Sequence, residues 1–226
     1  MKTSGVARRG FTLVELLVVL TVIGILMAIL VPAVSSALDS GKSVHCQNNL
    51  SQFGKAIQQY AGDSKDSLPY MNTSGNNLRW DLALLPYVGQ STNIYWCVAD
   101  RYVVPTSDGV SYGANGNNDG GDHPFRHAAS PNKPFLMSAF ASNVGDLILM
   151  ADLYSSDAAA KPRLGLGTAP NVRYSNLPNL HKKGISGNYL MATLSVKTFL
   201  TTDPVVKLSS GQGNPWSSYD ASNLTP

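Results

Sequence analysis

Hydrophobic residues fill one long stretch near the start of the chain. Between Phe11 and Val31 the only ionisable side chain is Glu15. At about 1.5 Å per residue, a helix of this length matches the roughly 30 Å hydrocarbon core of a bilayer. The ten residues before the stretch contain three basic side chains and no acidic one. The positive-inside bias therefore predicts a single membrane pass with a cytoplasmic N-terminus and an exported remainder.

A helical spacing of apolar residues continues beyond the proline at position 32. Pro32 can kink a long helix without ending it. After it, apolar residues recur mostly at intervals of three or four, the spacing of one buried helix face: Val34, Leu38, Cys46, Leu50, Phe53, Ile57 and Tyr60. We therefore expect one helix from Phe11 to Ala61, with Gly62 as its C-cap and its second half packed on a folded head.

The rest of the chain alternates loop-rich stretches with short apolar segments. The expected regular elements are a short helix at 79–88, a buried extended segment at 93–98, a central strand at 144–152 and a strand or hairpin at 188–199. The expected irregular stretches are 105–134, 154–178 and the tail from 208. The predicted fold class is α+β: a long N-terminal helix, half transmembrane and half head-packed, with a small C-terminal antiparallel β-sheet head.

Three classes of N-terminal segment share this general composition. A cleaved secretory signal has an apolar core of about 7 to 15 residues and a small-residue cleavage site, whereas this apolar run is longer and lacks such a site. A plain signal anchor explains the length and the charges. It does not explain Glu15, because a carboxylate is costly in hydrocarbon. The third class, which the next paragraph describes, accounts for Glu15 as well.

The residues on either side of Gly10 follow a specific order. The run RRGFTLVE, from Arg8 to Glu15, places two arginines before a glycine and an acid five residues beyond it, and a long apolar helix follows. This order closely resembles the class III signal of type IV pilins and type II secretion pseudopilins. The resemblance implies that prepilin peptidase cuts between Gly10 and Phe11 and that the new amine is methylated. It also implies that Glu15 and Pro32 serve assembly.

The same resemblance implies a structural protein rather than an enzyme. The chain would be a subunit of a type IV pilus-like or type II secretion pseudopilus filament. Its partners would be prepilin peptidase, other pilin or pseudopilin subunits, the membrane, and an assembly platform membrane protein with its ATPase. It would start in the bacterial inner membrane and end in a periplasmic or cell-surface filament. The alternative is a single-pass anchored extracytoplasmic binding protein that does not polymerise.

This interpretation divides the chain into three parts. Residues 1–10 would be a leader peptide and residues 11–34 a transmembrane and filament-core helix. Residues 35–226 would form the pilin-like head, which includes the second half of the helix.

Short motifs in the head also resemble a bacterial pilin-like subfamily with an H-x9-DG signature. The run from Cys46 to Leu50 matches Cys-x-Asn-x-Leu, and the run from Trp80 to Tyr87 matches Trp-x-x-x-Leu-x-Pro-Tyr. The run from Cys97 to Asp100 lacks the proline of a Cys-Pro-x-Asp motif. His181 opens the last signature, but its Asp-Gly is replaced by Thr-Leu and lies two residues further on.

The two cysteines of the chain, Cys46 and Cys97, both fall on the predicted exported side, where disulfides persist. A bond between them would close a loop of about 52 residues and stabilise the fold by roughly 4 kcal/mol through chain entropy. Two buried free thiols are the alternative, because spacing does not establish the geometry that a disulfide needs.

Charge and histidine placement argue against nucleic-acid binding and against catalysis. The formal net charge is +3, and it comes from the first ten residues, which carry three of the 17 basic residues and none of the 14 acidic ones. Lys182 and Lys183 form a lone basic pair, so no extended positive face is expected. The histidines occur without a nucleophile motif or a set of metal ligands: His45, His123, His127 and His181.

We expect no cofactor, and calcium is the better of two inorganic candidates. Asn115, Asn117 and Asp119 alternate and precede Gly120, as in the first half of a calcium loop. The closing acid of that loop would fall on Arg126, so an ordinary solvated loop is the favoured alternative. Zinc at His123 and His127 is weaker, because Pro124 lies between them.

Overall fold

The computed structural model describes most of the N-terminal half of the chain and selected segments beyond it. These are residues 11–71, 79–100, 110–116, 124–125, 136–138, 147–153, 171–172, 180–181, 184–200 and 202–203. The chain divides into two compact units, Met1–Leu38 and Asp39–Pro226.

Helix α1 spans Leu13–Asp63, so it begins in the first unit and ends in the second. The predicted long helix is confirmed, and Pro32 lies inside it without ending it. Every residue from 11 to 38 is exposed, including the large apolar side chains. This first part of α1 is long and apolar enough to cross a membrane.

The second unit has its core on the later turns of α1. Leu50, Phe53 and Ile57 are fully buried. The ring of Phe53 meets those of Tyr95, Tyr112 and Trp80 edge-on, at centroid distances of 4.9, 5.6 and 6.0 Å. The predicted apolar stripe is therefore correct from Cys46 onward, whereas its first two members, Val34 and Leu38, belong to the first unit and are exposed.

The end of α1 differs from the expectation. Gly62 lies within the helix, and the turn that ends it places Lys65 and Asp66 at positive φ, 55° and 66°. The Asp66 N–H donates to the Ala61 carbonyl at 2.8 Å. The prediction of a Gly62 cap was wrong because tertiary contacts fix this turn instead: Asp66 accepts bonds from the backbone N–H groups of residues 137 and 138, at 2.7 and 2.9 Å.

Two short helical segments follow. Helix α2 spans Trp80–Leu84 and continues into the 3₁₀ helix η1, Leu85–Val88, which confirms the predicted helical segment at 79–88. The 3₁₀ helix η2 spans Thr92–Tyr95, so the predicted extended segment at 93–98 is wrong at its start. The backbone turns there because the Trp96 N–H donates to the Asn93 carbonyl at 3.2 Å. The predicted burial of this segment does hold for Ile94 and Tyr95.

Among the described residues, the second unit contains a five-stranded sheet in the order β3-β1-β2-β4-β5. Its strands are β1 Tyr112–Asn115, β2 Ile148–Asp152, β3 Asn171–Val172, β4 Ser186–Met191 and β5 Val196–Leu200. Four strands pair antiparallel, and the two-residue β3 pairs parallel with β1. The α+β class with an antiparallel sheet is confirmed, as are the central strand β2 and the β4–β5 hairpin.

Two of these strands lie in stretches that were predicted to be loops. Strand β1 falls within 105–134 and β3 within 154–178. Strand β1 forms because Tyr112 and Ala114 are fully buried and its backbone pairs with β2, although its neighbours in the sequence are glycine and asparagine. The tail from 208 lies outside the described residues.

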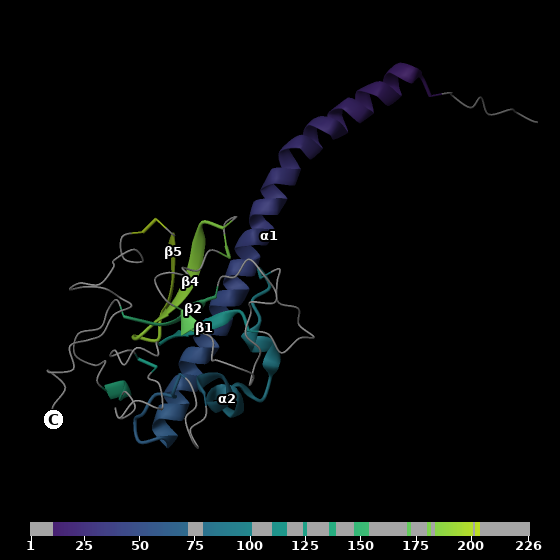
Figure 1. The fold of residues 1–226 in the computed structure, drawn as a ribbon. Coiled ribbons are helices and arrows are strands. Elements are labelled where there is room, and N and C mark those ends of the chain that lie inside the picture. Colours follow the sequence, from purple (N-terminus) through teal and green to yellow (C-terminus); the bar gives the residue numbers. More distant parts are fainter. Residues whose placement is uncertain are drawn as a thin grey trace, which may run out of the picture. The chain divides into compact units, whose positions relative to one another are not determined.

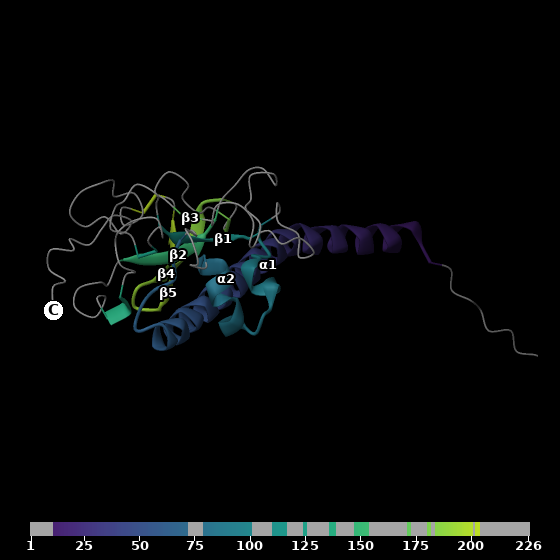
Figure 2. The same cartoon turned by 60° about the horizontal axis from the view of Figure 1, so that its bottom comes forward.

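The part of α1 beyond Asp39 and helix α2 lie on one face of the sheet (Figures 1 and 2). Polar bonds join α1 to the hairpin: the Gln47 amide donates to the Thr198 hydroxyl at 2.8 Å, and that hydroxyl donates to the side-chain oxygen of Asn188 at 2.6 Å. A second apolar cluster includes Ile148, Tyr189 and Met191.

Candidate functional site

The start of α1 carries the first group of predicted site residues. Gly10 lies outside the described residues, and Phe11 is exposed. The Glu15 carboxylate accepts the Thr12 N–H at 2.9 Å and the Thr12 hydroxyl at 2.8 Å, while the Glu15 N–H donates back to that hydroxyl at 3.3 Å. This reciprocal arrangement is a capping box, which satisfies donors that a helix N-terminus otherwise leaves without partners.

The capping box gives Glu15 a role within its own chain. Sequence reasoning missed it, although the signal was present: a threonine followed three residues later by glutamate, directly before an apolar run. Glu15 lies in the first turn of α1, where a negative charge also interacts favourably with the helix dipole.

A buried cluster around the two cysteines is the second group. Cys46 on α1 and Cys97 form a disulfide, with their Cα atoms 5.2 Å apart and both residues fully buried. The bond ties α1 to the segment that follows η2. His181, the residue that opens the degraded H-x9-DG signature, lies beside it: its Nε2 is 3.7 Å from the Cys97 sulfur.

Asp152, at the end of β2, completes this cluster. One carboxylate oxygen, Oδ2, lies 3.1 Å from His181 Nε2 and accepts the backbone N–H of Asn188 at 2.8 Å. Within the described part of the chain, Oδ1 of Asp152 and Nδ1 of His181 have no hydrogen-bond partner. The sequence singled out His181 through the degraded signature, but it gave no sign that the sheet brings Asp152 beside it.

Tyr112 lies close to the same cluster. Burial raises the pKa of its phenol well above the usual value, and the negative charge of Asp152 raises the pKa further. The Asn49 amide donates to the phenol oxygen at 3.1 Å. Tyr112 is therefore a neutral, protonated core residue and supplies no charge to the site.

The calcium candidate is described only at Asn115, since Asn117 and Asp119 lie outside the described residues. Asn115 is buried, and its side-chain N–H donates to the Ile148 carbonyl at 2.7 Å. The next residue, Gly116, is closely surrounded: a Cβ there would lie 2.3 Å from the Met71 sulfur and 2.4 Å from the Phe125 carbonyl oxygen. The glycine is thus required for packing, and Asn115 supports the sheet. The weaker zinc candidates His123 and His127, and the basic pair Lys182 and Lys183, also lie outside the described residues.

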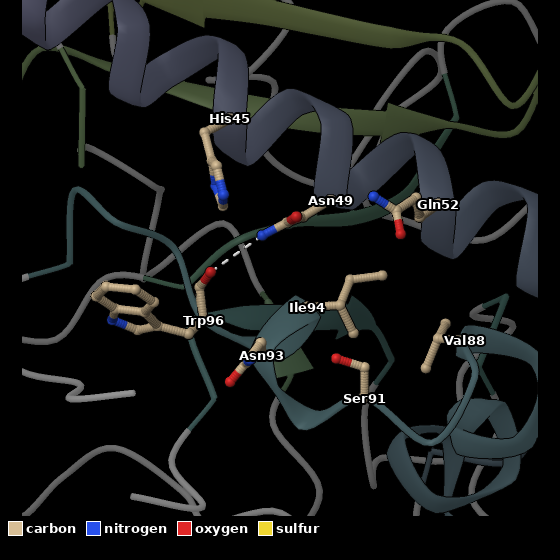
Figure 3. Close-up of a pocket in the computed structure, with 8 residues that line it drawn as sticks. All are labelled: His45, Asn49, Gln52, Val88, Ser91, Asn93, Ile94 and Trp96. Atoms are coloured by element: carbon tan, nitrogen blue, oxygen red, sulfur yellow. Dashed lines mark hydrogen bonds between the residues drawn. The ribbon is translucent and has the colours of Figure 1, made fainter. Parts of the chain in front are cut away.

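An open pocket of about 390 Å³ lies on the head between α1 and the segment around η2 (Figure 3). Its lining is mainly polar: His45, Asn49, Gln52, Val88, Ser91, Asn93, Ile94 and Trp96. The Asn49 amide donates across it to the Trp96 carbonyl at 3.0 Å. His45, a histidine without a motif in the sequence, is an exposed residue of this pocket.

Two family models match the chain. Residues 6–31 match the prokaryotic N-terminal methylation motif, and residues 41–96 match a family described as a protein of unknown function (DUF1559). No curated protein and no solved structure matches the chain. The N-terminal match confirms the predicted prepilin-type signal. Together with the long helix and the small sheet, the two matches confirm the resemblance to type IV pilin-like proteins.

Proposed function

We propose that the chain is a structural, non-enzymatic subunit of a type IV pilus-like or type II secretion pseudopilus filament. The observation that carries the proposal is that the methylation motif at 6–31 overlaps a helix whose residues are all exposed up to position 38. A continuous apolar surface of this size needs lipid or other protein to cover it. A membrane covers it in the precursor, and neighbouring helices cover it in a filament.

Processing converts the precursor into the assembling form. Cutting between Gly10 and Phe11 removes the basic leader and creates an amine at Phe11. This new cation lies next to the capping box in the sequence, so the Glu15 carboxylate of a neighbouring subunit can pair with it. A buried ion pair is about neutral in net stability once desolvation is counted, whereas a single buried charge is strongly unfavourable. The pair therefore sets the axial register of the helices, and apolar contacts provide most of the cohesion.

Pro32 also serves assembly in this proposal. Proline supplies no N–H for the helical hydrogen bond to the residue four positions earlier. The helix continues through it, so the missing bond gives α1 a place to bend as it leaves lipid and packs among other helices.

The proposed route needs specific partners and locations. Prepilin peptidase in the bacterial inner membrane would cut the precursor. An assembly platform membrane protein and its ATPase would then move the mature subunit into a periplasmic or cell-surface filament with other pilin or pseudopilin subunits.

N-terminal sequencing of the mature protein, combined with shearing and pelleting of filaments, tests the proposal. The mature chain should begin at Phe11 with a methylated amine. Gly10→Val should accumulate as uncut precursor in the membrane, because a branched side chain hinders access to the scissile bond. Gly41→Val is the matched control, since an added Cβ at that position meets nothing within 4 Å; it should be cut normally.

Two outcomes would contradict this function. Detection of Lys2 on the mature extracellular form would show that the leader is retained. The second outcome is a correctly cut chain that stays entirely in the membrane and is absent from the sheared pellet. It would favour the alternative, an anchored extracytoplasmic binding protein. The pocket in Figure 3 would then be the first candidate ligand site.

A further inference from the structure

The buried cluster around the disulfide contains side chains of the types that bind metal ions. Cys46, Cys97 and His181 each offer one ligand atom, and these three atoms all lie within 4.8 Å of one another. Asp152 adds a carboxylate oxygen 3.1 Å from the same His181 nitrogen. All four residues are buried.

Two spacings around the His181 nitrogen are close to those of a tetrahedral zinc site. Zinc bonds of about 2.3 Å to sulfur and about 2.0–2.1 Å to nitrogen or oxygen place neighbouring ligand atoms roughly 3.3–3.8 Å apart. The His181 nitrogen lies 3.7 Å from the Cys97 sulfur and 3.1 Å from the Asp152 oxygen. The two sulfurs are too close to act as separate ligands, because they are bonded to each other, and reduction would let them separate.

The disulfide by itself does not account for the histidine and the aspartate. Burying polar groups is costly unless they are fully hydrogen-bonded. Among the described residues, His181 Nδ1 and Asp152 Oδ1 have no partner, and a disulfide sulfur is only a weak acceptor. An imidazole beside two cysteine sulfurs, with a carboxylate beside that imidazole, does supply the ligand types that a zinc-class ion prefers.

We propose that the head has a second, reduced state in which Cys46, Cys97 and His181 bind a zinc-class divalent ion, with Asp152 as the fourth ligand. A dithiol reductant supplies two electrons and two protons to the disulfide and is itself oxidised to a disulfide. The two thiols of the protein then release their protons to solvent as the ion binds the thiolates. The neutral imidazole binds through the Nε2 lone pair and keeps its proton on Nδ1.

This site would be structural rather than catalytic. Four protein ligands leave no open position for a substrate. Because the cluster is buried, the ion enters only when the head opens locally, so both loading and release are slow. In either redox state α1 remains linked to the segment after η2, once by a disulfide and once through the metal. The inference does not depend on filament assembly.

Cobalt spectroscopy on the full chain in detergent tests the proposal. The protein is reduced with a phosphine, freed of reductant without oxygen, and titrated with Co²⁺. One equivalent should produce thiolate-to-cobalt charge-transfer absorption and the d–d bands of tetrahedral cobalt, and Zn²⁺ should displace them. The oxidised protein should show neither. His181→Ala and Asp152→Asn should weaken metal affinity by about tenfold or more.

The controls distinguish metal binding by the four-residue cluster from metal binding by two free thiols alone. His45→Ala changes an exposed histidine outside the cluster and should bind as tightly as the parent. Circular dichroism of each variant in the oxidised state checks that its head is folded. Absence of the cobalt bands in the reduced parent protein would overturn the proposal. Equal affinity in the parent and in His181→Ala would also overturn it, because two free thiols alone would then account for the binding.

Discussion

Phe53 provides the sharpest test of how the head is held on α1. Its side chain is fully buried, and its ring meets three other rings edge-on, at centroid distances from 4.9 to 6.0 Å. Phe53→Ala removes the ring and leaves a cavity, which should lower the free energy of unfolding by about 3–5 kcal/mol. Phe53→Leu keeps most of the volume, so its cost should be smaller and should come mainly from the lost ring contacts.

The ring contacts set the expected size of that smaller effect. Edge-to-face pairs contribute about 0.5–1.5 kcal/mol each beyond the area they bury, and leucine recovers part of this by its own packing. We expect Phe53→Leu to cost about 2 kcal/mol. Denaturant unfolding of the full chain in detergent, followed by tryptophan fluorescence with the disulfide intact, measures both variants. Lys55→Ala, an exposed change on the same helix, should have almost no effect.

Two results would refute this reasoning. A loss below about 1 kcal/mol for Phe53→Ala would mean that the site collapses around the missing ring or that the head is held elsewhere. Equal losses for the alanine and leucine variants would mean that the edge-on contacts, rather than filled volume, dominate the packing at this position.

Three further predictions concern the cap, the buried phenols and divalent ions. Thr12→Val removes one half of the capping box and should leave filament yield largely intact. Glu15→Leu and Glu15→Gln should lower filament yield, although the amount of subunit in the membrane stays normal. An equal loss of yield in all three variants would mean that Glu15 acts through capping alone. Burial raises the pKa of Tyr95, so its folded pKa lies above its unfolded value. The contribution of the Tyr95 phenol to stability is therefore present below a pH of about 10 and is lost as the pH rises further. In Tyr95→Phe, the denaturant midpoint of unfolding should decrease less steeply with pH above this value than in the parent protein. Chelators should leave the melting temperature of the oxidised head unchanged, because Arg126 stands where a calcium loop has its closing acid. A chelator-induced drop in melting temperature that calcium reverses would instead support calcium binding at the 115–119 loop.

The elements that the sequence predicted are those with strong local patterns. The stripe through Leu50, Phe53 and Ile57 predicted the buried face of α1 because a helix repeats every 3.6 residues. The apolar run of β2 and the β-branched and aromatic residues of the β4–β5 hairpin were visible as strand signals in the sequence. The segment at 79–88 was predicted to be helical, which the structure confirms.

The features that the sequence did not predict depend on distant partners. Strand β1 contains two glycine or asparagine residues in four positions and forms because β2 lies beside it. The end of α1 depends on residues 137 and 138. The meeting of Cys97, His181 and Asp152 combines three segments far apart in the sequence, and no local periodicity could have indicated it.

The position of the disulfide along α1 has a mechanical consequence for a subunit under tension. A pull on the N-terminal part of the helix first loads the hydrogen bonds between Ser43 and Asn188. The first covalent link to the rest of the head is the disulfide between Cys46 and Cys97. The later turns, from Leu50 to Asp63, then carry little of the load. The aromatic core around Phe53 is therefore not pulled away from the sheet. Extension under force should stop at Cys46 in the oxidised protein and continue through the core once the bond is reduced.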